Sequence, residues 1–315
     1  MVKYIVKRIL LMIPIILGIS FVVFSLLEIS PSDAAEIMLG MNGTPETLAA
    51  LRESLGLNDP FLTRYFRYIF DALRGDFGVS WRTGLSVLEE ITSRLPTTVA
   101  LAVGSIVLTV AIGIPIGVLS AVKQYSLLDN CTLAGALLLS SMPEFWLGTM
   151  MILLFSLRLS WLPAMGDGTF RSFLMPWAAM SAASMATIVR MTRSSMLEVI
   201  RADYIKMARA KGASEGRVIM KHSLRNALLP VTTIVGMNFA KLLGGAMIIE
   251  TVFTLPGLGS LALTSVRQLD VPMVMAEVLF IAIIAGFTNL LVDVLYVYID
   301  PRLKSQYVRP KKAKN

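Results

Sequence analysis

The sequence predicts an all-α integral membrane protein with six membrane-spanning helices. Of its 315 residues, 55% are hydrophobic and 16% are charged, whereas a soluble domain carries about 25% charged residues. Six stretches are long and apolar enough to cross about 30 Å of hydrocarbon as helices. They cover residues 9–29, 96–122, 132–157, 172–189, 228–251 and 273–299.

The first apolar stretch follows Lys3, Lys7 and Arg8, an arrangement that a secretory signal peptide shares. Its apolar run continues from Ile9 to Leu27, which is longer than the roughly 7–15 residues of a signal sequence. We therefore expect residues 1–30 to form a retained N-terminal helix.

Two features are expected inside the remaining helices. Pro14 and Pro115 fall within spans, where neighbouring helices can satisfy the freed backbone groups. The fourth stretch is rich in small residues, such as Ala178, Ala182 and Ala186, which predicts close packing against other helices.

The distribution of Lys and Arg predicts the orientation. With the N-terminus inside, the internal segments 1–8, 123–131, 190–227 and 300–315 carry 3, 1, 9 and 6 basic residues. The short external segments 158–171 and 252–272 carry 2 and 1. Because positive residues gather on the cytoplasmic side, both termini are predicted to be cytoplasmic, and 300–315 is a basic tail.

Residues 31–94 form the longest external connection. Turn signals at Asn42-Gly43 and Asn58-Asp59-Pro60 and the aromatic residues Tyr65, Phe66 and Phe70 predict a small, partly helical cap on the outer face.

Composition also limits the chemistry. The net charge of +8 is explained by orientation in the bilayer and not by nucleic-acid binding. With one cysteine and one histidine, the chain is expected to hold no disulfide, no metal site and no catalytic residue. Nineteen methionines could suggest a metal pathway, but at helical positions in lipid they are interpreted as gap-filling apolar side chains.

The cytoplasmic segment 190–227 has the punctuation of two helices. Asp203 is expected to cap the first helix, and Gly212 to end it after Arg209 and Lys211. Ser214 is expected to cap a second helix that runs toward residue 228. The small residues Ala208 and Ala210 would let another surface approach closely. The alternative interpretation is an ordinary, positively charged cytoplasmic loop.

Several motifs carry a resemblance to a known family. Residues 203–212 read Asp-Tyr-Ile-x-x-Ala-Arg-Ala-Lys-Gly, and residues 222–230 read His-x-Leu-Arg-Asn-Ala-x-x-Pro. Both resemble the cytoplasmic loop of the dipeptide/oligopeptide/nickel branch of type I ABC importer permeases. The match continues at 55–60, 75–80, 94–98, 191–197 and 250–259 and so covers nearly the whole chain. Residues 30–34 depart from that branch.

The resemblance implies a type I transmembrane domain over residues 95–299, in a bacterial or archaeal plasma membrane. It implies a second permease, two cytoplasmic ATPases and an external solute-binding protein as partners. ATP and Mg²⁺ would act on the ATPases, since this chain has no Gly-Lys dipeptide for a phosphate loop. The implied coupling loop is 201–226, with contacts from Asp203, Tyr204, Ala208, Arg209, Lys211, Gly212, His222, Arg225 and Asn226.

Ionisable residues inside spans are functional candidates, because burying a charge in hydrocarbon is costly. Glu144 and Lys241 are predicted near mid-depth, where they either pair or contact the two ends of a peptide. Glu250 and Glu277 are further candidates for the substrate pathway, and Asp293 lies toward the inner end of the last span. The tight turn 256–259 is interpreted as shaping an outer gate, as contacting the binding protein, or as a plain loop.

The function predicted from these observations is import of small peptides by an ATP-driven transporter. Nickel chelates and glutathione are alternative substrates within the same family. A secondary transporter or channel is the alternative of another class, and a membrane enzyme is disfavoured by the lack of a nucleophile or metal constellation.

Overall fold

The computed structural model describes residues 2–29, 34–39 and 44–299. Helix is the regular structure throughout this part of the chain, apart from an isolated bridge between Val79 and Ser86. The predicted basic tail 300–315 and the predicted turn at Asn42-Gly43 lie outside the described residues. The chain forms two compact units, one built from 99–255 and the segment after 287, the other from 2–98 and 256–287.

The unit that contains the N-terminal helix has seven helical elements, two of which continue into the other unit. They are α1 (Val2–Glu28), α2 (Ala34–Leu39), α3 (Pro45–Ser54), α4 (Phe61–Leu73), the start of α5 (Val87–Val122), α12 (Leu258–Arg267) and the start of α13 (Val271–Ile299). The presence of α2, α3 and α4 confirms that the predicted cap is helical in part.

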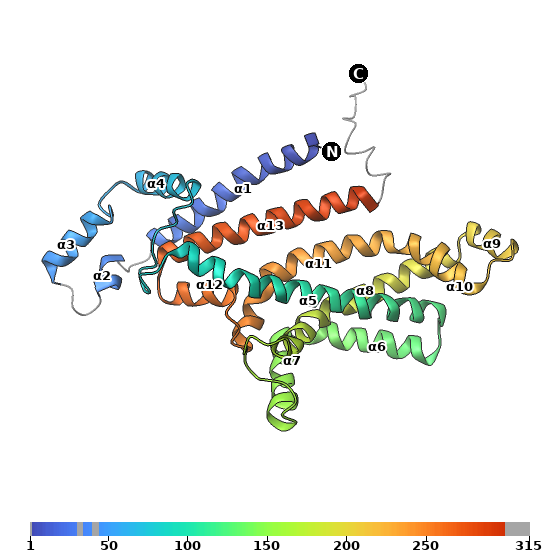
Figure 1. Ribbon diagram of the computed structural model, residues 1–315. Coiled ribbons are helices and arrows are strands. Elements are labelled where there is room, and N and C mark those ends of the chain that lie inside the picture. The colour runs from blue at the N-terminus through green and yellow to red at the C-terminus, as the bar shows by residue number, and fades with distance from the viewer. Residues whose placement is uncertain (1, 30–33, 40–43, 300–315) are drawn as a thin grey trace, which may run out of the picture. The chain divides into compact units, whose positions relative to one another are not determined.

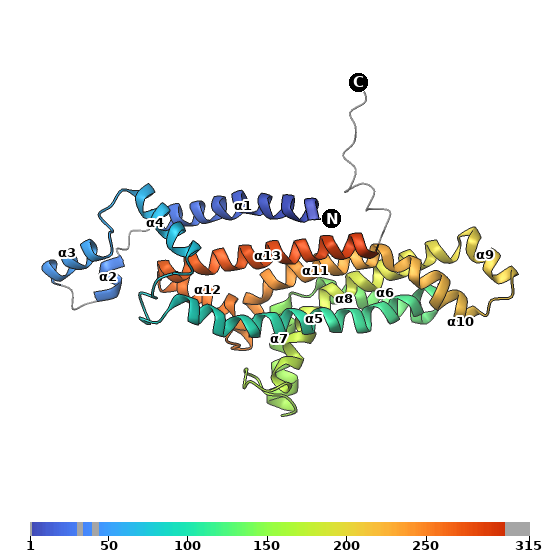
Figure 2. The same ribbon diagram turned by 45° about the horizontal axis from the view of Figure 1, so that its top comes forward.

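Aromatic packing joins α4 to α1 within this unit, and Figure 2 shows α4 at the C-terminal end of α1. Tyr65 is buried, its hydroxyl donates to the Leu17 carbonyl over 3.0 Å, and it lies 2.9 Å from the Ser20 hydroxyl. Hydrogen bonds to Asp270 join another pair of segments in this unit. The Asp270 carboxylate accepts from the Ser80 hydroxyl and, over 3.2 Å, from the Trp81 backbone N–H.

The other unit holds the rest of α5 and α13 and the following elements: α6 (Leu127–Ser141), α7 (Glu144–Met151), the π-helical stretch η2 (Ile152–Arg158), α8 (Arg171–Ile200), α9 (Asp203–Ala210), α10 (Glu215–Arg217), the π-helical stretch η3 (Val218–Ser223) and α11 (Leu224–Val252). Figure 1 shows α8 running beside α6 and α11, with α9 beyond its C-terminal end.

Five of the six predicted spans each fall on a single helix, and the third falls on a bent pair of helical segments. In the described part of the chain, α1, α5, α8 and α13 are long and apolar enough to cross a membrane, and the bent pair of α6 with α7 and η2 would make a fifth. The predicted span 228–251 falls on α11, whose 29 residues correspond to roughly 43 Å of helix.

The continuous third span predicted over 132–157 is wrong. The chain bends by 101° between Ser141 and Glu144. Proline causes the break: Pro143 cannot donate a backbone hydrogen bond, and Met142 before it adopts an extended backbone with φ −85° and ψ 128°. Glu144, expected in the middle of a span, is instead the first residue of α7.

The close packing predicted for the fourth span is confirmed. Ala182 and Ala186 of α8 are buried. A Cβ atom on Gly117 of α5 would lie 2.6 Å from the Thr192 Cβ and 2.8 Å from the Val189 carbonyl oxygen, closer than real atoms approach. These two helices therefore meet almost backbone to backbone, and α8 extends eleven residues past the predicted end at Val189.

Candidate functional site

The short helix α9 ends as the sequence predicts, at Gly212. The backbone of Gly212 has φ +82°, a left-handed conformation that costs glycine little. Its N–H donates to the Arg209 carbonyl over 2.9 Å, and the Ala213 N–H returns to the Ala208 carbonyl over 3.2 Å. The last carbonyl groups of α9 are thus satisfied by the turn that leaves the helix.

The beginning of α9 differs from the prediction by one residue. Ala202, with an extended backbone, occupies the cap position, and Asp203 is the first residue of the helix and caps no backbone group. The Asp203 carboxylate instead accepts a hydrogen bond from the Lys206 ammonium over 2.9 Å. At this position the negative charge still favours the positive end of the helix.

An ion pair closes the turn between α9 and α10. The Arg209 Nε lies 2.7 Å from the Glu215 Oε1, and its terminal nitrogen lies 3.3 Å from Oε2. Hydrogen bonding to Arg209 lowers the pKa of the Glu215 carboxyl. Ser214 stands at the predicted cap position, but its side chain makes no capping bond.

The second predicted helix is not separate from the fifth span. α10 is followed without a break by η3 and then by α11. His222 is half-buried in η3, and Arg225 and Asn226 are exposed in the first turn of α11. The Asn226 amide donates to the His222 carbonyl over 2.7 Å.

One face of α9 is buried and the other is exposed. Ile205 is fully buried and Ala208 half-buried against the chain's own helices. Tyr204 and Met207, neighbours on the helix surface, are 48% and 59% exposed, and Met220 of η3 is 62% exposed. Met207 and Met220 belong to the predicted cytoplasmic segment 190–227 and so lie outside the membrane positions to which the gap-filling interpretation applies. The segment 201–226 thus presents apolar and cationic side chains together.

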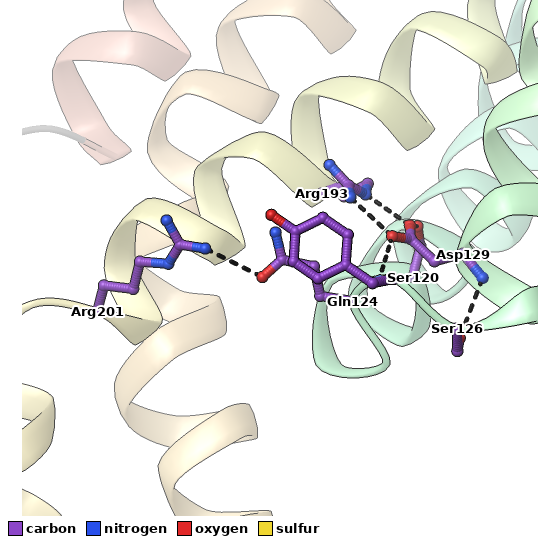
Figure 3. Close-up of polar contacts among 7 residues, drawn as sticks. Ser120, Gln124, Ser126, Asp129, Arg193 and Arg201 are labelled. Atoms are coloured by element: carbon purple, nitrogen blue, oxygen red, sulfur yellow. Dashed lines mark hydrogen bonds and ion pairs between the residues drawn. The ribbon is translucent and has the colours of Figure 1, made fainter.

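A buried polar network lies near the base of this segment (Figure 3). Asp129 of α6 is 1% exposed, and its two oxygens accept from Arg193 of α8 at 2.6 Å and 2.7 Å. The Ser120 hydroxyl of α5 and, over 2.9 Å, the Tyr125 backbone N–H also donate to this carboxylate. Sequence reasoning missed the pair, because the two residues lie 64 positions apart.

The four candidate pathway residues have different surroundings. Glu144 is half-buried and Lys241 is exposed, and their charges interact although no ion pair within 4.0 Å joins these two described residues. Glu250 is fully buried near the end of α11. Glu277 is also buried, in the unit that contains α1. The side chain of Asp293 lies outside the described part.

No metal-binding constellation is found in the described ranges. Within residues 2–29, 34–39 and 44–299, no group of three or more His, Cys, Asp or Glu side chains could hold a metal ion. Cys131 is an exposed free thiol.

Family models match both parts of the chain. Residues 113–305 match the binding-protein-dependent transport system inner membrane component, and residues 1–102 match the N-terminal model of the same transport systems. The chain is 40% identical over 332 aligned positions to a dipeptide transport system permease of Alkalihalophilus pseudofirmus, with 96% of this chain and 100% of the relative covered.

Other relatives have different named substrates. An oligopeptide transport permease of Bacillus subtilis is 38% identical, covering 96% of this chain and all of the relative. A glutathione transport permease of Escherichia coli K12 is also 38% identical, covering 96% and 99%. The fold resembles the inward-facing MetNI methionine ABC transporter, with a TM-score of 0.52, 19% identity, and coverage of 67% of this chain and 96% of that one.

Proposed function

Because the chain belongs to the family of binding-protein-dependent transport system inner membrane components, we propose that it forms half of the pathway through which an ATP-driven importer carries small peptides. As a member of that family it is a multi-pass membrane permease subunit and not an enzyme. The other half of the pathway is assigned to a second, homologous permease.

Support for this role comes from α9, a helix on the connection between α8 and α11 that leaves Tyr204 and Met207 uncovered. Apolar side chains beside cations are typical of the centre and rim of a protein interface. We assign this face to an ATPase subunit, since α9 is joined at both ends to long helices and a push on it moves both.

The remaining partners follow from the same assignment. Two ATPases bind ATP and Mg²⁺ on the cytoplasmic side, and an external binding protein delivers the substrate. Both termini are then cytoplasmic, an orientation supported by the basic residues of segments 1–8 and 300–315. The helices α2, α3 and α4 lie on the opposite, outer side.

Small peptides are the proposed substrates because the named relatives carry dipeptides, oligopeptides and glutathione, all of which hold an amine and a carboxylate. Lys241 and Glu144 offer the complementary charges. Since no direct ion pair ties them to each other, each remains able to meet one end of a zwitterion. Glutathione and nickel chelates are the competing substrates.

A reconstitution experiment tests the function. The chain is co-expressed with candidate partners, namely a second homologous permease, two ATPases and a solute-binding protein, and the complex is placed in proteoliposomes. We expect uptake of a radiolabelled dipeptide that requires both ATP and the binding protein, with stronger competition by unlabelled dipeptide than by glutathione or a nickel chelate. Uptake by this chain without ATP would identify a channel or secondary transporter instead.

Cross-linking tests the docking face separately. In a Cys131→Ser background, Tyr204→Cys should cross-link to an ATPase subunit. Leu62→Cys, an equally exposed position on α4, is the matched control and should not. Cross-linking from position 62 and never from 204 would overturn the assignment of α9.

A further inference from the structure

The Asp129 network joins three helices at a single point. Ser120 lies at the end of α5, Asp129 in the first turn of α6, and Arg193 in the last third of α8. The Tyr125 N–H comes from the turn between α5 and α6, where Tyr125 has φ 64°. The C-terminal part of α8 is therefore fixed to the whole α5–α6 turn, as Figure 3 shows.

The contact is directional as well as attractive. Arg193 meets the carboxylate with two nitrogens, and a two-point contact between planar groups fixes their relative orientation. Ser120 and Tyr125 supply two more donors, so both carboxylate oxygens are fully engaged. By contrast, the apolar cluster beside it, which includes Val118, Met196 and Ala227, attracts the helices without fixing their register.

The helices pack closely around this contact. Gly117 of α5 packs against Thr192, the residue before Arg193, at a distance that admits no side chain. A second tie lies nearer α9, where Arg201 donates to the Gln124 side chain over 3.0 Å. Movement of the end of α8 must therefore carry the α5–α6 turn with it.

The network lies between α9 and the break in the third span. Arg193 is seven residues before the end of α8 at Ile200, and α9 begins three residues later at Asp203. On the other side, α6 runs from Asp129 to the bend that precedes Glu144, a distance of roughly 20 Å.

We propose that Asp129 and Arg193 are positioning residues that transmit displacement of α9 to α6, and through α6 to the pathway residue Glu144. Their two-point contact makes peptide movement depend on ATP hydrolysis. The role rests on the proposed function of the chain as an importer permease, and it assigns the pair to neither substrate nor ATPase contact.

The test removes both charges at once. A single substitution would leave a buried charge without its partner and damage folding, whereas Asp129→Leu with Arg193→Met replaces the pair by apolar side chains of similar bulk. In the reconstituted transporter we expect normal assembly and continued ATP hydrolysis. The number of peptides imported per ATP should fall about fivefold or more, the scale of a coupling between distant sites.

A conservative variant and a control complete the experiment. Arg193→Lys keeps the positive charge but loses the two-point contact of the guanidinium with Asp129. The number of peptides imported per ATP should therefore fall without loss of assembly. Lys123→Gln removes an exposed charge from the same turn and should leave the ratio unchanged. If the double variant fails to assemble, Arg193→Lys decides the question.

Three results would overturn the proposal: an unchanged ratio in the double variant, an unchanged ratio in Arg193→Lys, or loss of assembly in both, which would make the pair a folding element alone. A wild-type complex without ATP-dependent uptake would instead refute the proposed function, so the two failures are distinguishable.

Discussion

Replacing Gly212 by alanine changes the backbone energy of the turn that ends α9 and little else. A Cβ atom at this position would meet nothing within 4 Å, so no packing cost arises. The φ of +82° is the source of the strain, and an L-residue held in a left-handed conformation costs about 1–2 kcal/mol. That cost should make opening of the turn about 5–30 times more frequent.

Hydrogen exchange measures this opening directly. The amides of Lys211, Gly212 and Ala213 all donate to carbonyls of α9, and their protection reports the closed turn. Gly216→Ala is the matched control: its Cβ also meets nothing within 4 Å, and its φ is not left-handed, so alanine should stabilise it by about 0.4–1 kcal/mol. Equal protection in wild type and Gly212→Ala, or equal loss in both variants, would refute the reasoning.

Three further predictions concern other parts of the same unit. Gly117→Val forces α5 away from α8 and should destabilise the solubilised protein by about 1–3 kcal/mol, seen as a lower thermal midpoint, whereas Gly135→Ala, which has open space, should not. The hydrogen bond to Arg209 lowers the pKa of the Glu215 carboxyl. The ion pair therefore stabilises the turn at any pH above the pKa of the unfolded chain, and this stabilisation is lost as the pH falls through the lower pKa of the folded protein. A spin label beside the turn should become mobile in that acidic range, and Glu215→Gln should be mobile throughout. Lys241→Met should assemble normally but import dipeptides poorly, and full uptake would exclude Lys241 from the pathway.

The elements that sequence predicts well here are those with a local cause. The end of α9 depends on one glycine and the hydrogen bonds of its own turn, so Gly212 could be identified without a structure. Asp203 shows the limit of such reasoning. A carboxylate is favourable both at the cap and one residue later, so the sequence does not separate the two positions.

The features that the sequence did not predict depend either on a local backbone restriction or on residues that lie far apart in the chain. The two helices on either side of Pro143 are together apolar enough to pass as one span, and the restriction that proline places on the backbone of Met142 is what bends it. Asp129 and Arg193 come from different helices, and nothing near either residue indicates the partner. Their pairing depends on how closely α5 and α8 approach, which is set by Gly117, five residues before the end of α5.

The π-helical stretch η3 determines the angular phase between the α9 segment and α11. In a π-helix each turn holds about one residue more than in an α-helix, so the six residues Val218–Ser223 turn the chain by about 100° less than six α-helical residues would. Rewinding the same six residues as an ordinary α-helix would therefore turn everything before them by about 100° around the axis of α11, whereas deleting one of them would let an α-helix keep the present direction. After such rewinding, Tyr204 and Met207 would point along a different side of that axis. The π-helical winding of η3 therefore sets the direction that the exposed face of α9 presents.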